Sequence, residues 1–176
     1  MHLRLLFLVL LALLAAVPSQ AFPPAPTFTL RGVARDTFGW ALKASDQATV
    51  VVRDGTQIVA EGPVNETLRP GENFRVAIPM NTGSGDPYRP GAQSPGNLLS
   101  LEVRFPSGTQ PVLSVQADKR TVGEPGGSLF VDFTLGADSD GDGIPDQWEW
   151  WQLAEAGFGP GHPKWSLESF GTGDSD

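Results

Sequence analysis

The sequence predicts a mainly β protein, a seven-stranded antiparallel β-sandwich that is followed by an acidic loop and a short α-helical C-terminal segment. Three observations predict this fold class. Polar and apolar residues alternate through much of residues 27–136, which is typical of strands with one buried face. The chain of 176 residues contains 21 Gly and 16 Pro, which favours many turns over long helices. A dense acidic stretch over residues 138–149 follows the last alternating segment.

The first 21 residues predict an export signal. Arg4 gives a basic start, residues 5–17 form an uninterrupted apolar run, and residues 18–21 offer small side chains where a signal peptidase cuts. The run is shorter than the roughly 20 residues that a membrane span needs, and an uncleaved anchor is the alternative. We expect cleavage after Ala21, no membrane span in the mature chain, and a secreted or cell-surface protein.

Charge and cysteine content narrow the class of protein further. The formal net charge of −8 argues against nucleic acid or an anionic membrane as the partner. The sequence has no cysteine, so the fold must hold without disulfides, which is ordinary for a bacterial exported protein. The residues between the signal and the acidic loop suffice for one β domain, predicted over residues 22–136, with its own core.

Inside this domain the alternation sets the strands and their buried faces. Asp54-Gly55 between two β-rich runs predicts a tight hairpin. The predicted strands cover residues 27–35, 47–53, 57–61, 73–78, 99–105 and 129–135, with residues 111–116 as a weaker candidate. Short alternating strands separated by Gly/Pro turns favour a two-sheet sandwich. The residues predicted to face its core are Phe74, Val76, Ile78, Leu99, Leu101, Val103, Phe105, Leu129, Val131, Phe133 and Leu135.

Two stretches near the start of the β domain carry a family pattern, and they are Arg31-Gly32-Val33-Ala34-Arg35-Asp36-Thr37-Phe38-Gly39-Trp40 and Ala48-Thr49-Val50-Val51-Val52. Together they resemble the carboxypeptidase regulatory-like, or prealbumin-like, β-sandwich family. The resemblance covers residues 27–136 and implies a non-catalytic adhesive or spacer domain. A long insertion between Met80 and Asn97 departs from the family pattern. Within it, Tyr88 and Arg89 suit a sugar or a partner surface, or else anchor a solvated crossover.

The acidic stretch has the ligand spacing of an EF-hand calcium loop. Such a loop supplies side-chain oxygens from positions 1, 3 and 5, a carbonyl from 7, a side chain or water from 9 and a bidentate Glu from 12, with Gly at 6. Gly143 occupies the turn position. Ca²⁺ is therefore the expected cofactor, and the expected metal ligands are Asp138, Asp140, Asp142, the backbone of Ile144, Asp146 and Glu149.

A predicted strand, rather than a helix, precedes this loop, and Pro145 stands inside it. The segment Asp-Ser-Asp-Gly-Asp-Gly-Ile-Pro-Asp instead resembles the thrombospondin type 3 repeat and the similar DxDGDGxPDxWE segments of exported bacterial proteins. This resemblance covers residues 138–149. It implies a calcium-stabilised extracellular structure, with Asp138, Asp140, Asp142, Asp146 and Glu149 as ligands.

Pro145 suits the first turn of a helix over residues 147–156, which Gly157 would end. Ile144, Trp148 and Trp151 would share one helix face and dock it. Two of the tryptophans at 148, 150 and 151 cover the end of the β domain as core or, alternatively, the three form an aromatic sugar platform. Residues 164–170 predict another short helical segment. The chain then ends in residues 174–176, which repeat Asp138-Ser139-Asp140 and are either an acidic tail or the opening of a second calcium loop.

These features predict an exported, non-catalytic, calcium-binding structural or adhesion module of a bacterial cell surface or matrix. Its expected partners are calcium and a surface protein or a glycan. The alternatives are a carbohydrate-binding module and a polysaccharide-active enzyme fragment. An enzyme is disfavoured because there is no Cys and His162 is the only histidine after the signal segment, which leaves no nucleophile–His pair built on Cys and no ordinary zinc site.

Overall fold

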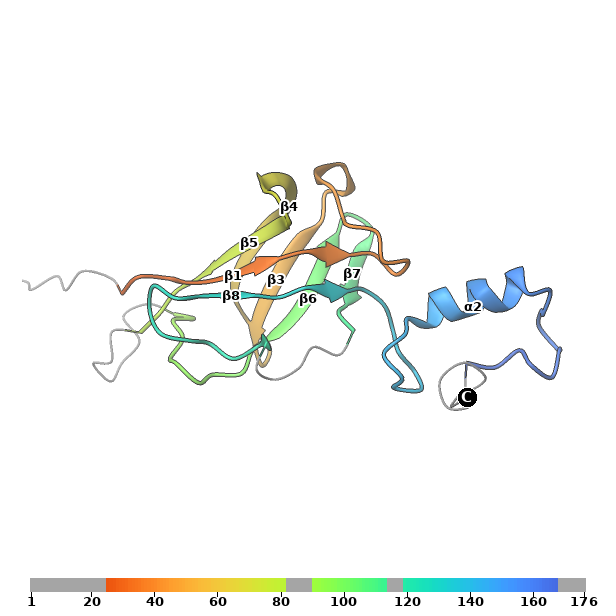
Figure 1. Cartoon of the computed structure of the whole chain (residues 1–176). Helices are drawn as coiled ribbons and strands as arrows, with labels where there is room; N and C mark the ends of the chain where they lie inside the picture. The colour runs from red at the N-terminus through yellow and green to blue at the C-terminus, as the bar shows by residue number, and fades with distance from the viewer. Residues whose placement is uncertain (1–24, 82–89, 114–118, 168–176) are drawn as a thin grey trace, which may run out of the picture.

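A computed structural model describes residues 25–81, 90–113 and 119–167 (Figure 1). The predicted signal segment, the Tyr88-Arg89 pair and residues 168–176 lie outside these ranges. Within the described ranges, no helix is long and apolar enough to cross a membrane.

The described chain is mainly β, and its principal sheet has seven strands. Their order across the sheet is β7-β6-β3-β4-β5-β1-β8, and a separate two-stranded sheet pairs β2 with β9. The strand bounds are β1 Phe28–Gly32, β2 Ala34–Arg35, β3 Thr49–Asp54, β4 Gln57–Arg69, β5 Glu72–Ile78, β6 Ser100–Phe105, β7 Gly108–Pro111, β8 Ser128–Phe130 and β9 Phe133–Thr134. A 3₁₀ turn, η1, spans Ala44–Asp46.

The prediction of an all-antiparallel sheet was wrong for the last strands. β8 runs parallel to β1, with Leu30 opposite Leu129, and β9 runs parallel to β2, with Ala34 opposite Phe133. Alternation sets only which face of a strand is buried, and this is the same for both strand directions, so the sequence pattern cannot distinguish them. The predicted strand 27–35 is divided into β1 and β2, and the predicted strand 129–135 is divided into β8 and β9. At this division the amide of Val33 donates to the Asp132 carboxylate at 2.9 Å.

The Asp54-Gly55 hairpin between β3 and β4 is confirmed, with Asp54 opposite Gln57 and Gly55 at φ +56°. β4 continues well past its predicted end. It pairs with β3 as far as Pro63 and with β5 from Val64 onward. At Gly62 a Cβ atom would lie 2.5 Å from the carbonyl oxygen of Arg75, so only glycine allows this close passage.

The core contains residues from both halves of the strand order. Phe74, Val76 and Ile78 of β5 are fully buried, as predicted. The same cluster contains Leu30 of β1, Val50 and Val52 of β3 and Val103 of β6, while Leu101, Phe105 and Leu129 are only partly buried against it. Burial of this apolar surface is the main stabilising contribution to the β domain.

The buried polar residue Asn73 holds in place the turn at residues 36–40, which contacts the C-terminal segment. The Asn73 side chain accepts a hydrogen bond from the amide of Ala34 at 2.7 Å and donates to the carbonyls of Ala34 and Leu42, at 2.9 and 2.8 Å. These bonds satisfy a side chain that is 4% exposed. They hold both ends of the turn at residues 36–40, which carries Phe38 and Trp40.

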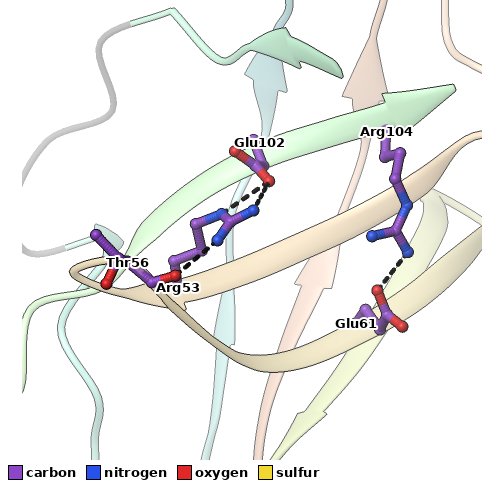
Figure 2. A network of polar contacts seen from close by, with 5 residues as sticks. All are labelled: Arg53, Thr56, Glu61, Glu102 and Arg104. Atoms are coloured by element: carbon purple, nitrogen blue, oxygen red, sulfur yellow. Dashed lines mark hydrogen bonds and ion pairs between the residues drawn. The ribbon is translucent and has the colours of Figure 1, made fainter. Parts of the chain in front are cut away.

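The outer face of β3, β4 and β6 carries cross-strand ion pairs (Figure 2). Arg53 contacts Glu102 at 2.8 Å and donates to the carbonyl of Thr56, while Arg104 pairs with Glu61. Val51 lies between Glu61 and Glu102 in the register and is fully buried. The aliphatic stems of long charged side chains can cover such a residue.

After β9 the chain leaves the sheet and forms helix α2, Asp146–Glu155 (Figure 1). Pro145 is the residue before its first turn. At the other end Gly157 has φ +81°, and the amide of Phe158 donates to the carbonyl of Leu153 at 2.9 Å, which is a glycine-terminated helix end. Residues 164–167 form turns, not the predicted second helical segment, whose remaining residues lie outside the described ranges.

Candidate metal centre

The acidic loop begins where the sheet ends. The amide of Leu135 donates to the carbonyl of Arg35, and the amide of Gly136 donates to the carbonyl of Pro111. A Cβ on Gly136, at φ +143°, would lie 2.8 Å from Cβ of Pro145, so the two ends of the loop touch at this glycine. The loop is therefore anchored to the β domain at both its beginning and its end.

Three of the predicted ligands meet. One carboxylate oxygen from each of Asp138, Asp140 and Asp142 lies within 4.8 Å of the other two. Asp138 accepts hydrogen bonds from the amides of Gly141 at 2.7 Å and Gly143 at 3.0 Å, which bend the loop around its carboxylate. Both glycines have positive φ, +82° and +91°, a conformation that most other residues adopt only with strain.

Asp142 lies farther inside the loop than Asp140. Its Oδ1 accepts a hydrogen bond from the amide of Ile144 at 2.8 Å. Its Oδ2 is buried and has no hydrogen-bond partner among the described residues. A buried carboxylate oxygen without a donor costs free energy unless a cation or a water satisfies it.

Glu149 supplies the most informative side chain of the site. It comes from the first turn of α2 and is fully buried, and neither of its carboxylate oxygens has a hydrogen-bond partner in the described part of the chain. Burial, followed by the negative charges of Asp140, Asp142, Asp146 and Asp138, raises the pKa of Glu149 to about 7. A cation among these carboxylates would reverse the effect, because opposite charge stabilises the ionised form.

Asp146 is placed differently from the other predicted ligands. Both of its carboxylate oxygens accept hydrogen bonds from Ser139, one from the amide and one from the hydroxyl, each at 2.7 Å. Its own amide donates to the carbonyl of Ala137 at 2.9 Å. Asp146 thus ties the start of α2 to the start of the loop, and it is not part of the triad of converging carboxylates.

The side chain of Ile144 faces an apolar hollow between the loop and the β domain. Phe38, Pro145 and Trp148 also line this hollow, which has a volume of about 350 Å³. The predicted role of the Ile144 carbonyl as a ligand stays a prediction, and the amide of Ile144 donates to the Asp142 carboxylate at 2.8 Å.

The predicted docking face of α2 does meet the β domain. Trp151 makes an edge-to-face contact with Phe38, with ring centroids 6.2 Å apart, and the Thr37 hydroxyl donates to the Gln147 side chain at 3.3 Å. Trp150 lies elsewhere and packs on Trp165, with ring centroids 4.8 Å apart. Trp151 remains 48% exposed, so the contact covers only part of the indole.

Sequence reasoning missed two residues that shape the site, Ser139 and Gly136. Ser139 occupies a loop position without a ligand role in the spacing rule, so the pattern gave no signal for it. Gly136 directly precedes the acidic stretch, and a glycine at a strand end is a signal for close backbone approach.

Comparison of the chain with protein-family models, with curated proteins and with solved structures finds no match.

Proposed function

We propose that residues 138–149 bind one Ca²⁺ ion and that this ion fastens α2 to the β domain of an exported, non-catalytic structural or adhesion module. The observation that carries the proposal is Glu149, a fully buried carboxylate without a hydrogen-bond donor, placed beside three converging aspartates. Without a cation, burial of this group is strongly unfavourable in its ionised form.

The donor set favours calcium. All candidate ligands are carboxylate or carbonyl oxygens, which hard cations prefer, and Ca²⁺ accepts six to eight of them in flexible geometry. Asp138, Asp140, Asp142 and Glu149 would hold the ion, with the carbonyl of Ile144 as a further ligand. Asp146 would position the loop through Ser139. Extracellular sites of this kind bind calcium with dissociation constants of about 10⁻⁴–10⁻³ M.

The ion would act as a fastener because its ligands come from two structural elements. The aspartate triad lies on the loop, and Glu149 lies on α2. Binding both sets to one ion restrains α2 against the turn at residues 36–40, where Phe38 meets Trp151. These contacts are few, so the restraint from the ion is a large part of what orders the helix.

We also infer that the seven-stranded sheet folds over as a β-sandwich, and that the molecule is related to the prealbumin-like sandwiches and thrombospondin type 3-like repeats its sequence resembles. Support comes from the single core cluster, which combines β1 and β5 with β3 and β6, and from the close passage of β4 at Gly62. The apolar segment at residues 5–17 supports secretion. A surface protein or a glycan is the expected partner.

Calcium titration of the full chain, followed by tryptophan fluorescence, tests the proposal. Trp148 and Trp151 lie at the junction between α2 and the β domain, so their emission should change in millimolar calcium. Asp142→Ala should abolish the change. The matched control is Asp132→Ala, whose carboxylate lies in the β domain and binds the amide of Val33. An identical titration in Asp142→Ala and in the unmodified chain would refute the site.

A further inference from the structure

We propose that a second hollow, on the exposed side of the acidic loop, binds a neutral saccharide. This inference rests on the proposed function, because the hollow shares the loop with the proposed calcium site. The hollow has a volume of about 340 Å³. It is formed because the chain turns back after α2 and brings Trp165 onto Trp150. Its lining residues are Ser139, Asp140, Trp150, Trp165, Ser166 and Leu167.

The lining matches the two-sided chemistry of a sugar ring. A pyranose presents C–H groups on its faces and hydroxyls around its edge. The indoles of Trp150 and Trp165 pack on each other with planes 31° apart, and the surface that they leave uncovered lines the hollow and is apolar enough for such a face. Ser139, Asp140 and Ser166 offer oxygen atoms to the hydroxyls. Small-ligand sites commonly combine a mostly apolar lining with a few polar groups in this way, and about 340 Å³ lies within their range of size.

Saccharide binding should depend on calcium because the acidic loop forms one wall of the hollow. Asp140 is the exposed member of the aspartate triad, and Asp138 and Asp142 are partly buried. The hollow therefore opens on the accessible side of the predicted ion, and an ordered loop is needed to hold Ser139 and Asp140 in place. We expect saccharide binding to depend on calcium for this reason.

Charge selects a neutral ligand over an anionic one. Five acidic side chains, Asp138, Asp140, Asp142, Asp146 and Glu149, surround an ion of charge +2, and the whole chain carries a formal net charge of −8. The local field would repel an acidic polysaccharide. Neutral hexose polymers carry the hydroxyls that the hollow can bind without this penalty.

The test measures binding of soluble mannan, galactan and β-glucan to the full chain by calorimetry, in about 5 mM calcium, above the expected dissociation constant, and in EDTA. Polygalacturonate serves as the anionic comparison. Trp150→Ala removes one stacking surface, and Ser166→Tyr fills the hollow while keeping both indoles. Trp40→Ala is the matched control, because Trp40 is 74% exposed on the β domain. Calcium affinity is measured separately for each variant.

We expect at least one neutral polymer to bind in calcium and not in EDTA. Affinity should fall by about ten-fold or more in Trp150→Ala and Ser166→Tyr, which corresponds to the loss of one well-placed contact, and should stay unchanged in Trp40→Ala. Ser166→Tyr should keep its calcium affinity. Normal calcium binding with no neutral polymer bound would overturn the saccharide site and leave the metal site intact. An equal loss of saccharide affinity in Trp40→Ala would also overturn the saccharide site, and so would binding of polygalacturonate as tight as binding of the neutral polymers. Absence of calcium binding would refute the metal site itself.

Discussion

Two buried glutamates, Glu72 in the sheet and Glu149 on α2, differ in the charges that surround their carboxylates. Burial alone would raise the pKa of Glu72, but the hydrogen bond and charge of Arg31, together with Arg75, outweigh it and hold the pKa below its ordinary value. Glu149 is surrounded by further carboxylates instead, and its pKa is raised to about 7. The β domain contains its own counter-charges, whereas in the function we propose a calcium ion supplies the counter-charge of the C-terminal segment.

The largest effect that this comparison predicts is at Arg31. Arg31→Ala should lower the free energy of unfolding of the β domain by more than any other substitution considered below, because it leaves the Glu72 carboxylate with the more distant Arg75 as its partner. The loss should be the same in calcium and in EDTA. Chemical denaturation of both forms measures it. Arg104→Ala, which breaks the half-exposed pair with Glu61, is the control and should change stability by less than about 1 kcal/mol. Equal losses in the two variants would remove the special role of the Arg31 pair.

Glu149→Gln should have the opposite sign in EDTA. Above pH 7, where Glu149 is ionised, replacing its carboxylate by a neutral amide removes repulsion by four aspartates, so the C-terminal segment should become more stable by about 1–2 kcal/mol. In calcium the same variant should bind the ion about ten-fold or more weakly, since it loses a bidentate ligand. Calorimetry with Glu155→Gln, at the exposed end of the same helix, is the control. Unchanged calcium affinity in Glu149→Gln would remove this residue from the site.

The pH dependence follows from the same residue. In the calcium-free chain, folded Glu149 with its raised pKa holds a proton that the unfolded chain releases near its ordinary pKa. The contribution of this group to stability is therefore greatest at low pH and is lost as the pH rises from about 4.5 to about 7, by at most about 1.4 kcal/mol per pH unit. Calcium affinity should rise over the same window. Thermal melts of the unmodified chain and of Glu149→Gln should differ in slope there, and parallel slopes would contradict this assignment.

Much of the β domain could be predicted because alternation records burial directly. The inward faces of β5 and β6 and the Asp54-Gly55 hairpin were readable from the pattern. Strand direction was not, since parallel and antiparallel neighbours bury the same residues, and the extension of β4 past Gly62 depends on a close contact with Arg75 that lies far away in sequence.

At the site, spacing identified the acidic residues and could not assign their individual roles. The spacing rule assigns both Asp146 and Glu149 to the metal. In the structure both carboxylate oxygens of Asp146 accept hydrogen bonds from Ser139, whereas the carboxylate of Glu149 has no donor among the described residues. This difference arises from how α2 leaves the loop at Pro145, which is a three-dimensional property and is absent from a linear pattern.

The smallest predicted effect lies on the outer face of the sheet. Glu61 and Arg104 are each about half exposed, so their ion pair should contribute less than about 1 kcal/mol and should weaken in high salt. A double-mutant cycle with Glu61→Gln and Arg104→Gln measures the coupling. A coupling above about 2 kcal/mol would show that charges of the β domain are less solvated than their exposure indicates.

Hydrogen exchange resolved along the chain, in EDTA and in millimolar calcium, measures whether calcium fastens α2 to the β domain. We expect calcium to slow exchange of the amides in α2 and in the acidic loop by about ten-fold or more, while the amides of β5 keep the same rate in both conditions. Equal protection of α2 with and without calcium would contradict it. So would a calcium effect that is as large in β5 as in α2.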